Sequence, residues 1–316
     1  MRMRHNTGTS TLSRYLPVMS ENENKTAAQT AAVSILDSLA AVRFSGADAL
    51  AFLQGQLTQN MLGQKNRVLP AGYCSPKGRL IATPRLVVLD DGSALAAFPK
   101  AGLEAVLKRL RMYVMRSKVT ITLADDIAVL GFVGAAPERF AGATVYAQES
   151  AAPAALIAAA LPAGRAIAFA VRSSIPESSA DESLYWLASI AAGDPWVFES
   201  TRELFVPQGI NLECVGGVSF TKGCYTGQEV VARVEHIGRT ARRAALFAAN
   251  RELNALAGAD VLEGGAPAGL VIQSATRAGR TLMLVQVDLE HLQSRNLTFA
   301  GETLHPLPLP YPYERA

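Results

Sequence analysis

The alternation of hydrophobic and polar positions in the first part of the chain predicts short strands mixed with a few helices. After SGAD at 45–48, a capping-box pattern with Ser45 as N-cap, leucines at 50, 53 and 57 lie on one helical face. The stretch YCSPKGRLIATPRLVVLDDGSALAAF at 73–98 predicts two strands around DDGS, with SPKG as the preceding turn. Apolar residues at helical spacing from Leu103 to Val114 and an alternating segment at 118–123 follow. A hairpin followed by a helix and a strand favours α+β units over a βαβ array.

The pattern of apolar and polar residues changes twice in the second part of the chain. Residues 125–175 form short apolar runs separated by Pro and Gly, and they allow no firm assignment. Ser179 and Glu182 form a second capping-box pattern, which predicts a helix that ends at Gly193. Beyond residue 241, short apolar strands separated by EGGAP and RAGR predict a small β-barrel or sandwich.

Composition and charge exclude several classes of protein. The 316 residues are about half hydrophobic, which is enough for a sizeable core, and no apolar run has the ~18 residues of a membrane span. A balance of 30 basic and 27 acidic residues gives no reason to expect direct nucleic-acid binding. Three cysteines without close pairing favour a reducing cytosol, and the lack of CxxC and HExxH gives little support to a metal site. We expect residues 1–30, which are polar, to form a loose tail.

The segment KGCYTGQEVVAR at 222–233 carries the strongest candidate for chemistry. A cysteine becomes nucleophilic when a nearby cation or a helix N-terminus favours its thiolate. Lys222 lies two positions before Cys224, and a helix is expected to begin at Tyr225. The alternative is that Cys224 is an ordinary buried cysteine, which is the usual fate of this residue. Cys74 and Cys214 lack this combination, and we interpret both as structural.

Other candidates near this segment have equally ordinary alternatives. His236 could pair with Cys224 as a general base, or it could be a solvated residue near a helix end. A basic cluster could bind an anionic ligand, or it could be a solvated face. Its members are Lys222, Arg233, Arg239, Arg242 and Arg243. Tyr185 or Trp186 could offer an aromatic wall to a ring-shaped ligand, or pack in the core.

The octapeptide KGCYTGQE at 222–229 resembles the signature of the YgfZ family of tetrahydrofolate-binding proteins, relatives of the glycine-cleavage aminomethyltransferase. Four further segments are similar to this family in the same order. They are SGADALAFLQGQLTQN at 45–60, CSPKGR at 74–79, VMRSKVTI at 114–121 and VPQGINLECVGGVSFTKGC at 206–224. The resemblance extends over residues 35–310.

The resemblance implies a fold, a function and a set of site residues. The expected fold class is α+β: an aminomethyltransferase-like body of two interleaved subdomains around a central folate cleft at 31–240, then a C-terminal β-barrel at 241–316. The implied function is assembly or repair of iron–sulfur clusters in client proteins such as radical tRNA-thiolating enzymes. Cys224 and Lys222 match the family's functional residues, with tetrahydrofolate or a derivative as cofactor. The candidate cofactor-binding residues are Trp186, Tyr225, Gly223, Gly227, Gln228, Glu229 and Arg233.

Two departures from the family shape the competing hypotheses. Leu39 stands where some relatives have a second tryptophan, which alters one wall of the expected pterin site. Ala82 and Thr83 stand where the aminomethyltransferase has an acidic pair, so the carboxylate needed for methylene transfer is missing. A folate-dependent aminomethyl or methyl transferase is therefore the second hypothesis. The third is an adaptor for RNA modification that uses the cluster from Arg233 to Arg243.

Overall fold

The computed structural model describes residues 32–64, 68–133, 144–145, 155–161, 165–175, 181–236 and 240–312. The expected tail at 1–30 lies outside these residues. No helix in the described part of the chain is long and apolar enough to cross a membrane.

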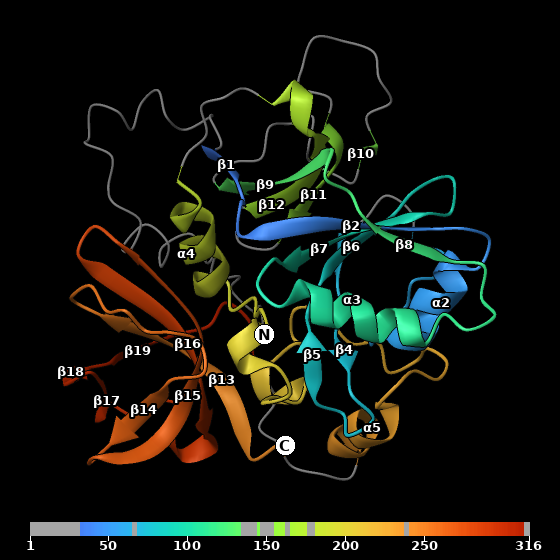
Figure 1. The fold of residues 1–316 in the computed structure, drawn as a ribbon. Helices are drawn as coiled ribbons and strands as arrows, with labels where there is room; N and C mark the ends of the chain where they lie inside the picture. The colour runs from blue at the N-terminus through green and yellow to red at the C-terminus, as the bar shows by residue number, and fades with distance from the viewer. Residues whose placement is uncertain are drawn as a thin grey trace, which may run out of the picture.

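The first layer of the body is a five-stranded sheet covered by two helices (Figure 1). Its strands, in spatial order, are β3 (Val68–Pro70), β6 (Arg85–Val88), β7 (Ala94–Pro99), β2 (Leu39–Ser45) and β8 (Thr120–Leu123). Helices α2 (Ala49–Gln56) and α3 (Leu103–Met112) bury their apolar faces against this sheet. The predicted DDGS hairpin is confirmed as β6 and β7, and Gly92 adopts the positive φ of 81° that the turn requires.

The second layer is another five-stranded sheet, and the chain passes between the two sheets. Its strands, in spatial order, are β1 (Ala32–Ile35), β9 (Ile127–Val133), β12 (Arg165–Val171), β11 (Ala155–Leu161) and β10 (Thr144–Val145). The chain enters through β1, builds the first sheet from β2 to β8, and returns at β9, so the subdomains are interleaved as expected. The described strands of the segment that allowed no assignment, β9, β10, β11 and β12, thus form this sheet together with β1.

Short elements join the two layers to the C-terminal part of the chain. The SPKG turn connects β4 (Tyr73–Cys74) and β5 (Leu80–Ala82), as predicted. The other elements are η3 (Arg172–Ser174), α4 (Ser183–Ala191), η4 (Glu199–Thr201), η5 (Gln208–Ile210) and α5 (Gln228–His236).

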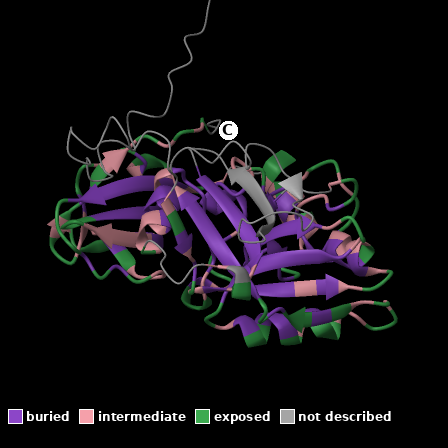
Figure 2. Cartoon of the chain, turned by 90° about the horizontal axis from the view of Figure 1, so that it is seen from above, coloured by how far each residue is buried: buried purple, intermediate pink, exposed green. Residues whose placement is uncertain are grey.

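Residues from Arg242 onward form the predicted β-barrel, which is nearly closed. Its strands, in spatial order, are β18 (Glu302–Thr303), β17 (Leu297–Phe299), β14 (Asp260–Glu263), β15 (Ala266–Arg277), β16 (Arg280–Asp288), β13 (Arg242–Ala249) and β19 (His305–Leu307), with η6 (Leu289–His291) between β16 and β17. Figure 2 shows that its strands, like those of the body, are largely buried. The α+β fold class with a C-terminal barrel is therefore confirmed.

The prediction of the first helix start is wrong. Ser45 is the last residue of β2, and helix α2 begins only at Ala49. The Asp48 carboxylate accepts a hydrogen bond from the Lys118 N–H at 2.6 Å instead of capping its own helix.

The prediction of the second helix start is also wrong. Glu182 directly precedes α4, and its carboxylate accepts hydrogen bonds from Ser38, while Ser179 lies outside the described residues. The helix does end at Gly193, as expected, with a φ of 65°. In both helices the acidic side chain binds a distant segment, a partner that local pattern cannot reveal.

Candidate functional site

The motif at 222–229 forms a loop followed by the first turn of α5. The helix predicted to begin at Tyr225 begins at Gln228, because Gly227 has a φ of 85°, outside the helical region. Cys224 therefore lies four residues before the first helical residue, and the expectation that it sits at a helix N-terminus is wrong.

Lys222 fixes this loop to the end of α2. Its Nζ donates to the carbonyl oxygens of Gln54 at 2.6 Å, Leu57 at 2.6 Å and Gln59 at 3.1 Å. Three donated bonds use all the hydrogens of an ammonium group, and the carbonyls of Gln54 and Leu57 lie at the negative end of α2. Burial lowers the pKa of Lys222 to about 8. The Lys222 Nζ thus donates to these carbonyls and not to the Cys224 thiol.

Tyr225 and Thr226 complete the contact with α2. The Lys222 Nζ lies 5.0 Å from the centre of the buried Tyr225 ring, within the range of a cation–π interaction. The Thr226 N–H donates to the Gly55 carbonyl at 3.3 Å. Residues on both sides of Cys224 are thus held in place.

Gly227 packs against the SPKG turn that follows Cys74. A Cβ at Gly227 would lie 2.5 Å from the Ser75 carbonyl oxygen and 3.1 Å from the Gly78 Cα. Gly78 is equally enclosed, since a Cβ there would lie 2.6 Å from the Cβ of Val230. Two segments of the family resemblance therefore meet backbone to backbone, which requires glycine at both positions.

Gly223 is different, although it belongs to the same motif. A Cβ at this position would meet nothing within 4 Å, and its φ is not in the left-handed region. No steric demand of the described residues accounts for a glycine here.

The three cysteines, all free thiols, lie in different environments. Cys224 is exposed. Cys74 is fully buried, and burial raises the pKa of its thiol to about 12. Burial, reinforced by the Glu213 carboxylate, also raises the pKa of Cys214 to about 12. Cys224 is therefore accessible, and the alternative that it is a buried packing residue is wrong.

Helix α5 carries the remaining candidates of the motif. Val231 is its buried residue, and the Val231 carbonyl accepts a hydrogen bond at 2.9 Å from Gln208. Glu229 lies in the first turn and Arg233 in the last, where their charges complement the helix dipole. His236 is the last residue of the helix and is exposed.

Trp186 lies in a different part of the body from the motif. In Figure 1, α4 and α5 lie on opposite sides of the body, with β4 and β5 between them. The partly buried Trp186 ring packs edge-on to Trp196, with 5.5 Å between ring centres. Leu39 is buried in the same apolar cluster as Trp196. The two positions expected to form the pterin walls therefore share one cluster, and the structure does not bring Cys224 to them.

The structure also places the other sites that the sequence suggested. Arg242 pairs with Asp288 at 2.9 Å and Arg243 with Glu213, so these cations are partly neutralised within the chain; Arg239 lies outside the described residues. Among the described residues, no group of three or more His, Cys, Asp or Glu side chains could hold a metal ion.

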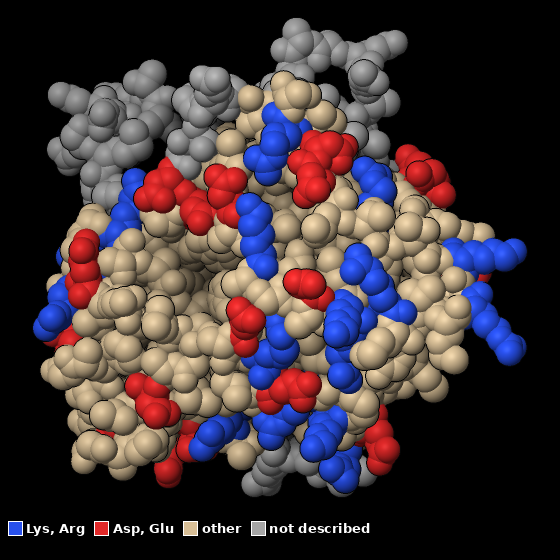
Figure 3. Space-filling model, in the orientation of Figure 1, with Lys and Arg blue, Asp and Glu red and all other residues tan. Residues whose placement is uncertain are grey.

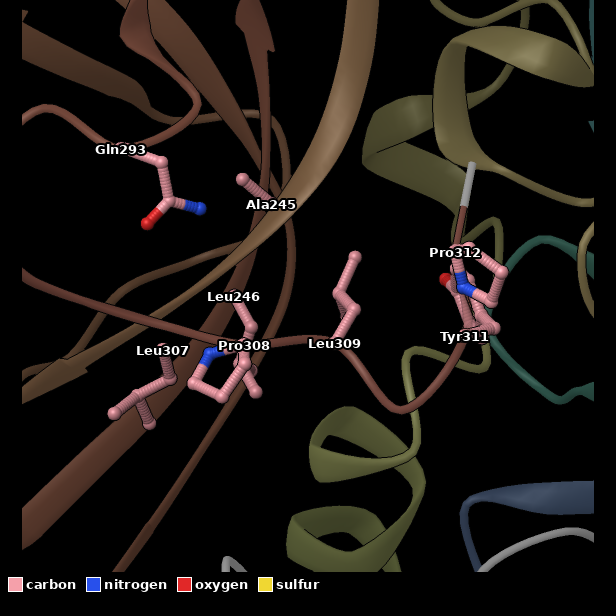
Figure 4. A pocket seen from close by; sticks show the side chains of 8 residues that line it. All are labelled: Ala245, Leu246, Gln293, Leu307, Pro308, Leu309, Tyr311 and Pro312. Carbon is pink, nitrogen blue, oxygen red and sulfur yellow. The ribbon is translucent and has the colours of Figure 1, made fainter. Parts of the chain in front are cut away.

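Hollows in the described surface lie away from the motif. Figure 3 shows a hollow of mostly uncharged atoms near the centre of the face, beside α4 as Figure 1 places it. A cavity of about 300 Å³ lies between the barrel and the segment that follows β19 (Figure 4). It is lined by Ala245, Leu246, Gln293, Leu307, Pro308, Leu309, Tyr311 and Pro312.

Comparison with known proteins assigns the family. No family model matches the chain. The tRNA-modifying protein YgfZ of Enterobacter sp. (strain 638) is 33% identical over 307 residues, covering 88% of this chain and 93% of that protein. The chain belongs to the YgfZ family. The YgfZ protein of Shigella boydii serotype 4 (strain Sb227) is 30% identical over 309 residues with the same coverage, and that of Hamiltonella defensa subsp. Acyrthosiphon pisum (strain 5AT) is 33% identical over 228 residues, covering 65% of this chain and 66% of that one.

Comparison of structures relates this YgfZ-family fold to an enzyme. The glycine cleavage system aminomethyltransferase T from Bartonella henselae aligns with a TM-score of 0.61 over 92% of this chain and 88% of that chain. Identity is 11%, so the likeness shows the fold alone.

Sequence reasoning missed the residues that position the YgfZ motif. The carbonyls of Gln54, Leu57 and Gln59 receive Lys222, and Gln208 holds α5. Their segments were visible only as parts of the family resemblance, because backbone acceptors leave no chemical signature in a sequence.

Proposed function

We propose that this protein is a tetrahydrofolate-binding factor that supports assembly or repair of iron–sulfur clusters in client proteins such as radical tRNA-thiolating enzymes. Its YgfZ relatives are named tRNA-modifying proteins, which supports a role in that process. The observation that carries the proposal is the exposed Cys224 on a loop fixed by Lys222 on one side and Gly227 on the other. An accessible thiol on a fixed loop is suited to transient contact with an iron–sulfur cluster. Because one cysteine cannot hold a cluster alone, the partner would supply the other ligands.

The folate would occupy the body near Trp186, as the family resemblance implies. The partly buried ring supports this location, and so does the hollow beside α4, the helix that carries Trp186, since ligand sites are concave and lined by aromatic side chains. The residues of the 222–229 motif that were expected to bind the cofactor lie instead beside Cys224, in a different part of the body from Trp186. The proposal therefore has two sites, one for the pterin and one for the client, in a body at 31–240 followed by a barrel at 241–316. The proposed setting is the cytoplasm, where the free thiols stay reduced.

The expected loss of aminomethyl transfer is supported by the environment of Ala82 and Thr83. Both are buried, and the Thr83 hydroxyl accepts a hydrogen bond from the Val197 N–H at 2.8 Å. Neither residue offers a carboxylate to a folate nitrogen, which disfavours the transferase hypothesis.

The proposed function is tested with a purified radical tRNA-thiolating enzyme whose cluster has been damaged by oxygen. Iron, sulfide, reductant and tetrahydrofolate are supplied, and recovery of the cluster absorbance is followed. Wild-type protein is expected to raise recovery, Cys224→Ala to leave it at the level without protein, and Cys214→Ala to act like wild type. Equal recovery with Cys224→Ala would contradict the role of the thiol. Recovery independent of tetrahydrofolate would contradict the role of the folate.

A further inference from the structure

The outward face of α3 combines basic and exposed apolar side chains. Residues on this face recur at helical spacing and continue into the following turn. Its exposed members are Glu104, Ala105, Lys108, Arg111, Met112, Met115 and Arg116. The single acid lies at the N-terminal end, so the face becomes basic toward Arg116. Figure 3 shows Lys and Arg gathered over α3 and below it toward α5.

The two methionines are unusually exposed. Met115 is 86% exposed, the most of any large apolar side chain in the described part of the chain, and Met112 is 63% exposed. Single exposed apolar residues are common, but adjacent methionines among arginines have the composition of protein interfaces. A flexible thioether side chain also adapts to varied partners.

The backbone holds Met115 in a costly conformation. Its φ is 44°, in the left-handed region, where an L-residue loses about 1–2 kcal/mol and glycine loses nothing. The turn is closed by a hydrogen bond from the Ser117 N–H to the Val114 carbonyl at 2.7 Å, which accounts for the backbone conformation. The exposed thioether makes no comparable contribution to the fold, and glycine would serve this turn at a lower cost.

Helix α3 is linked to the Cys224 loop through a short chain of packed residues. Arg109 of α3 lies beside Tyr73, where its charge opposes the rise in the tyrosine pKa caused by burial. Tyr73 is followed by Cys74, and Gly227 packs against the Cys74 Cβ. These contacts join α3 to the segment that carries Cys224 within one packed unit.

We propose that the face formed by Lys108, Arg111, Met112, Met115 and Arg116 docks an acidic segment of a client protein, with the methionines as apolar anchors. This inference rests on the proposed function, because it names the surface by which the client reaches Cys224. The lysine and arginine side chains favour an acidic partner. The methionines favour a protein over a nucleic acid, because the phosphate backbone of a nucleic acid has no apolar surface for them to pack against.

The test uses variants that leave the fold intact. Met115→Gly removes an anchor and relieves the strained backbone, and its control is Ala278→Gly, the same change at another left-handed residue, with a φ of 51° in the β15–β16 turn. Lys108→Glu with Arg116→Glu reverses the charge, and its control is Arg295→Glu, an exposed base of the barrel. Urea unfolding of each variant verifies the fold.

Binding of a purified radical tRNA-thiolating enzyme is measured by calorimetry at low and high salt. We expect wild-type binding to weaken with salt, and Met115→Gly and the charge reversal each to weaken Kd by about tenfold, the loss expected for an interface anchor. The two controls should bind like wild type. Unchanged Kd values for the α3 variants, or no binding by wild type, would overturn the docking surface. Loss of transfer-RNA binding in these variants, with binding of the enzyme unchanged, would also overturn the docking surface.

Cluster recovery separates this inference from the proposed function. A weaker docking interaction is compensated by a higher protein concentration, so an excess of the Met115→Gly protein should restore cluster recovery. The Cys224→Ala protein should not restore it at any concentration. Full recovery by Met115→Gly at the lowest active concentration would contradict docking on α3 and leave the proposed function standing.

Discussion

Replacing Gly227 by alanine is expected to destabilise the protein strongly, and the structure gives the size of the effect. The φ of 85° is costly for any residue with a Cβ, at about 1–2 kcal/mol. The new Cβ would also lie 2.5 Å from the Ser75 carbonyl oxygen, 3.0 Å from the Cys74 Cβ and 3.1 Å from the Gly78 Cα. These atoms belong to the backbone or are attached directly to it and cannot move aside, so overpacking adds about 1–3 kcal/mol. Together the two effects predict a loss of about 2–5 kcal/mol in the free energy of unfolding.

Gly223→Ala provides the matched control in the same motif. A Cβ there enters open space at an ordinary backbone conformation, so its effect should stay within about 0.5 kcal/mol. Both variants are compared with wild type by urea unfolding, followed by far-ultraviolet circular dichroism. A wild-type midpoint for Gly227→Ala, or equal damage by Gly223→Ala, would contradict the steric explanation of Gly227.

Three further predictions follow from buried and exposed groups. Lys222→Met should lower the free energy of unfolding by about 1–3 kcal/mol, because three carbonyls lose their donor, and an unchanged urea midpoint would contradict this. In the native protein at pH 8, iodoacetamide should modify Cys224 and spare Cys74 and Cys214, which mass spectrometry of peptides reports; early modification of Cys74 would be the contrary result. Burial opposes ionisation of Asp194, yet Arg85 at 2.5 Å and Arg165 at 3.0 Å hold the pKa of its carboxyl below the usual value. The stabilisation from ionised Asp194 is thus complete above pH ~4 and is lost as the pH falls through the folded-state pKa. Asp194→Asn should therefore lower the free energy of unfolding by about 3–5 kcal/mol at pH 7 and make stability depend less on pH on the acid side. An equally steep pH dependence in the variant would argue against this.

The elements with local causes were predictable from the sequence. The DDGS and SPKG turns depend on Gly92 and Gly78, whose positive φ is a property of glycine itself. The apolar spacing of α3 and the strands of the barrel likewise follow from neighbouring residues. The fold class followed from these elements and from the family resemblance.

The elements with distant partners were not predictable. Ser45 has the chemistry of a helix cap, but β2 extends through it because it pairs with Thr120 of β8. Strands β9 and β12 carry no hydrophobic–polar alternation that distinguishes them, since nearly all their residues are buried.

The candidate site likewise has one part that was predictable from the sequence and one part that was not. Its cysteine was found from a motif, whereas the acceptors of Lys222 lie 163 to 168 residues away in the chain. The helix start was misplaced because Gly227 serves a contact with the SPKG turn, which only the folded chain brings to it. Spacing within a motif therefore identifies a reactive residue but not the geometry that surrounds it.

The central claim, that exposed Cys224 carries the function, is tested most directly by the thiolated nucleosides of transfer RNA. A host strain lacking its own YgfZ-family protein receives the wild type, Cys224→Ala or Cys214→Ala at equal protein levels, and the nucleosides are quantified by mass spectrometry. Wild type and Cys214→Ala are expected to restore thiolation, whereas Cys224→Ala is not. Equal restoration by Cys224→Ala would contradict the role of this thiol.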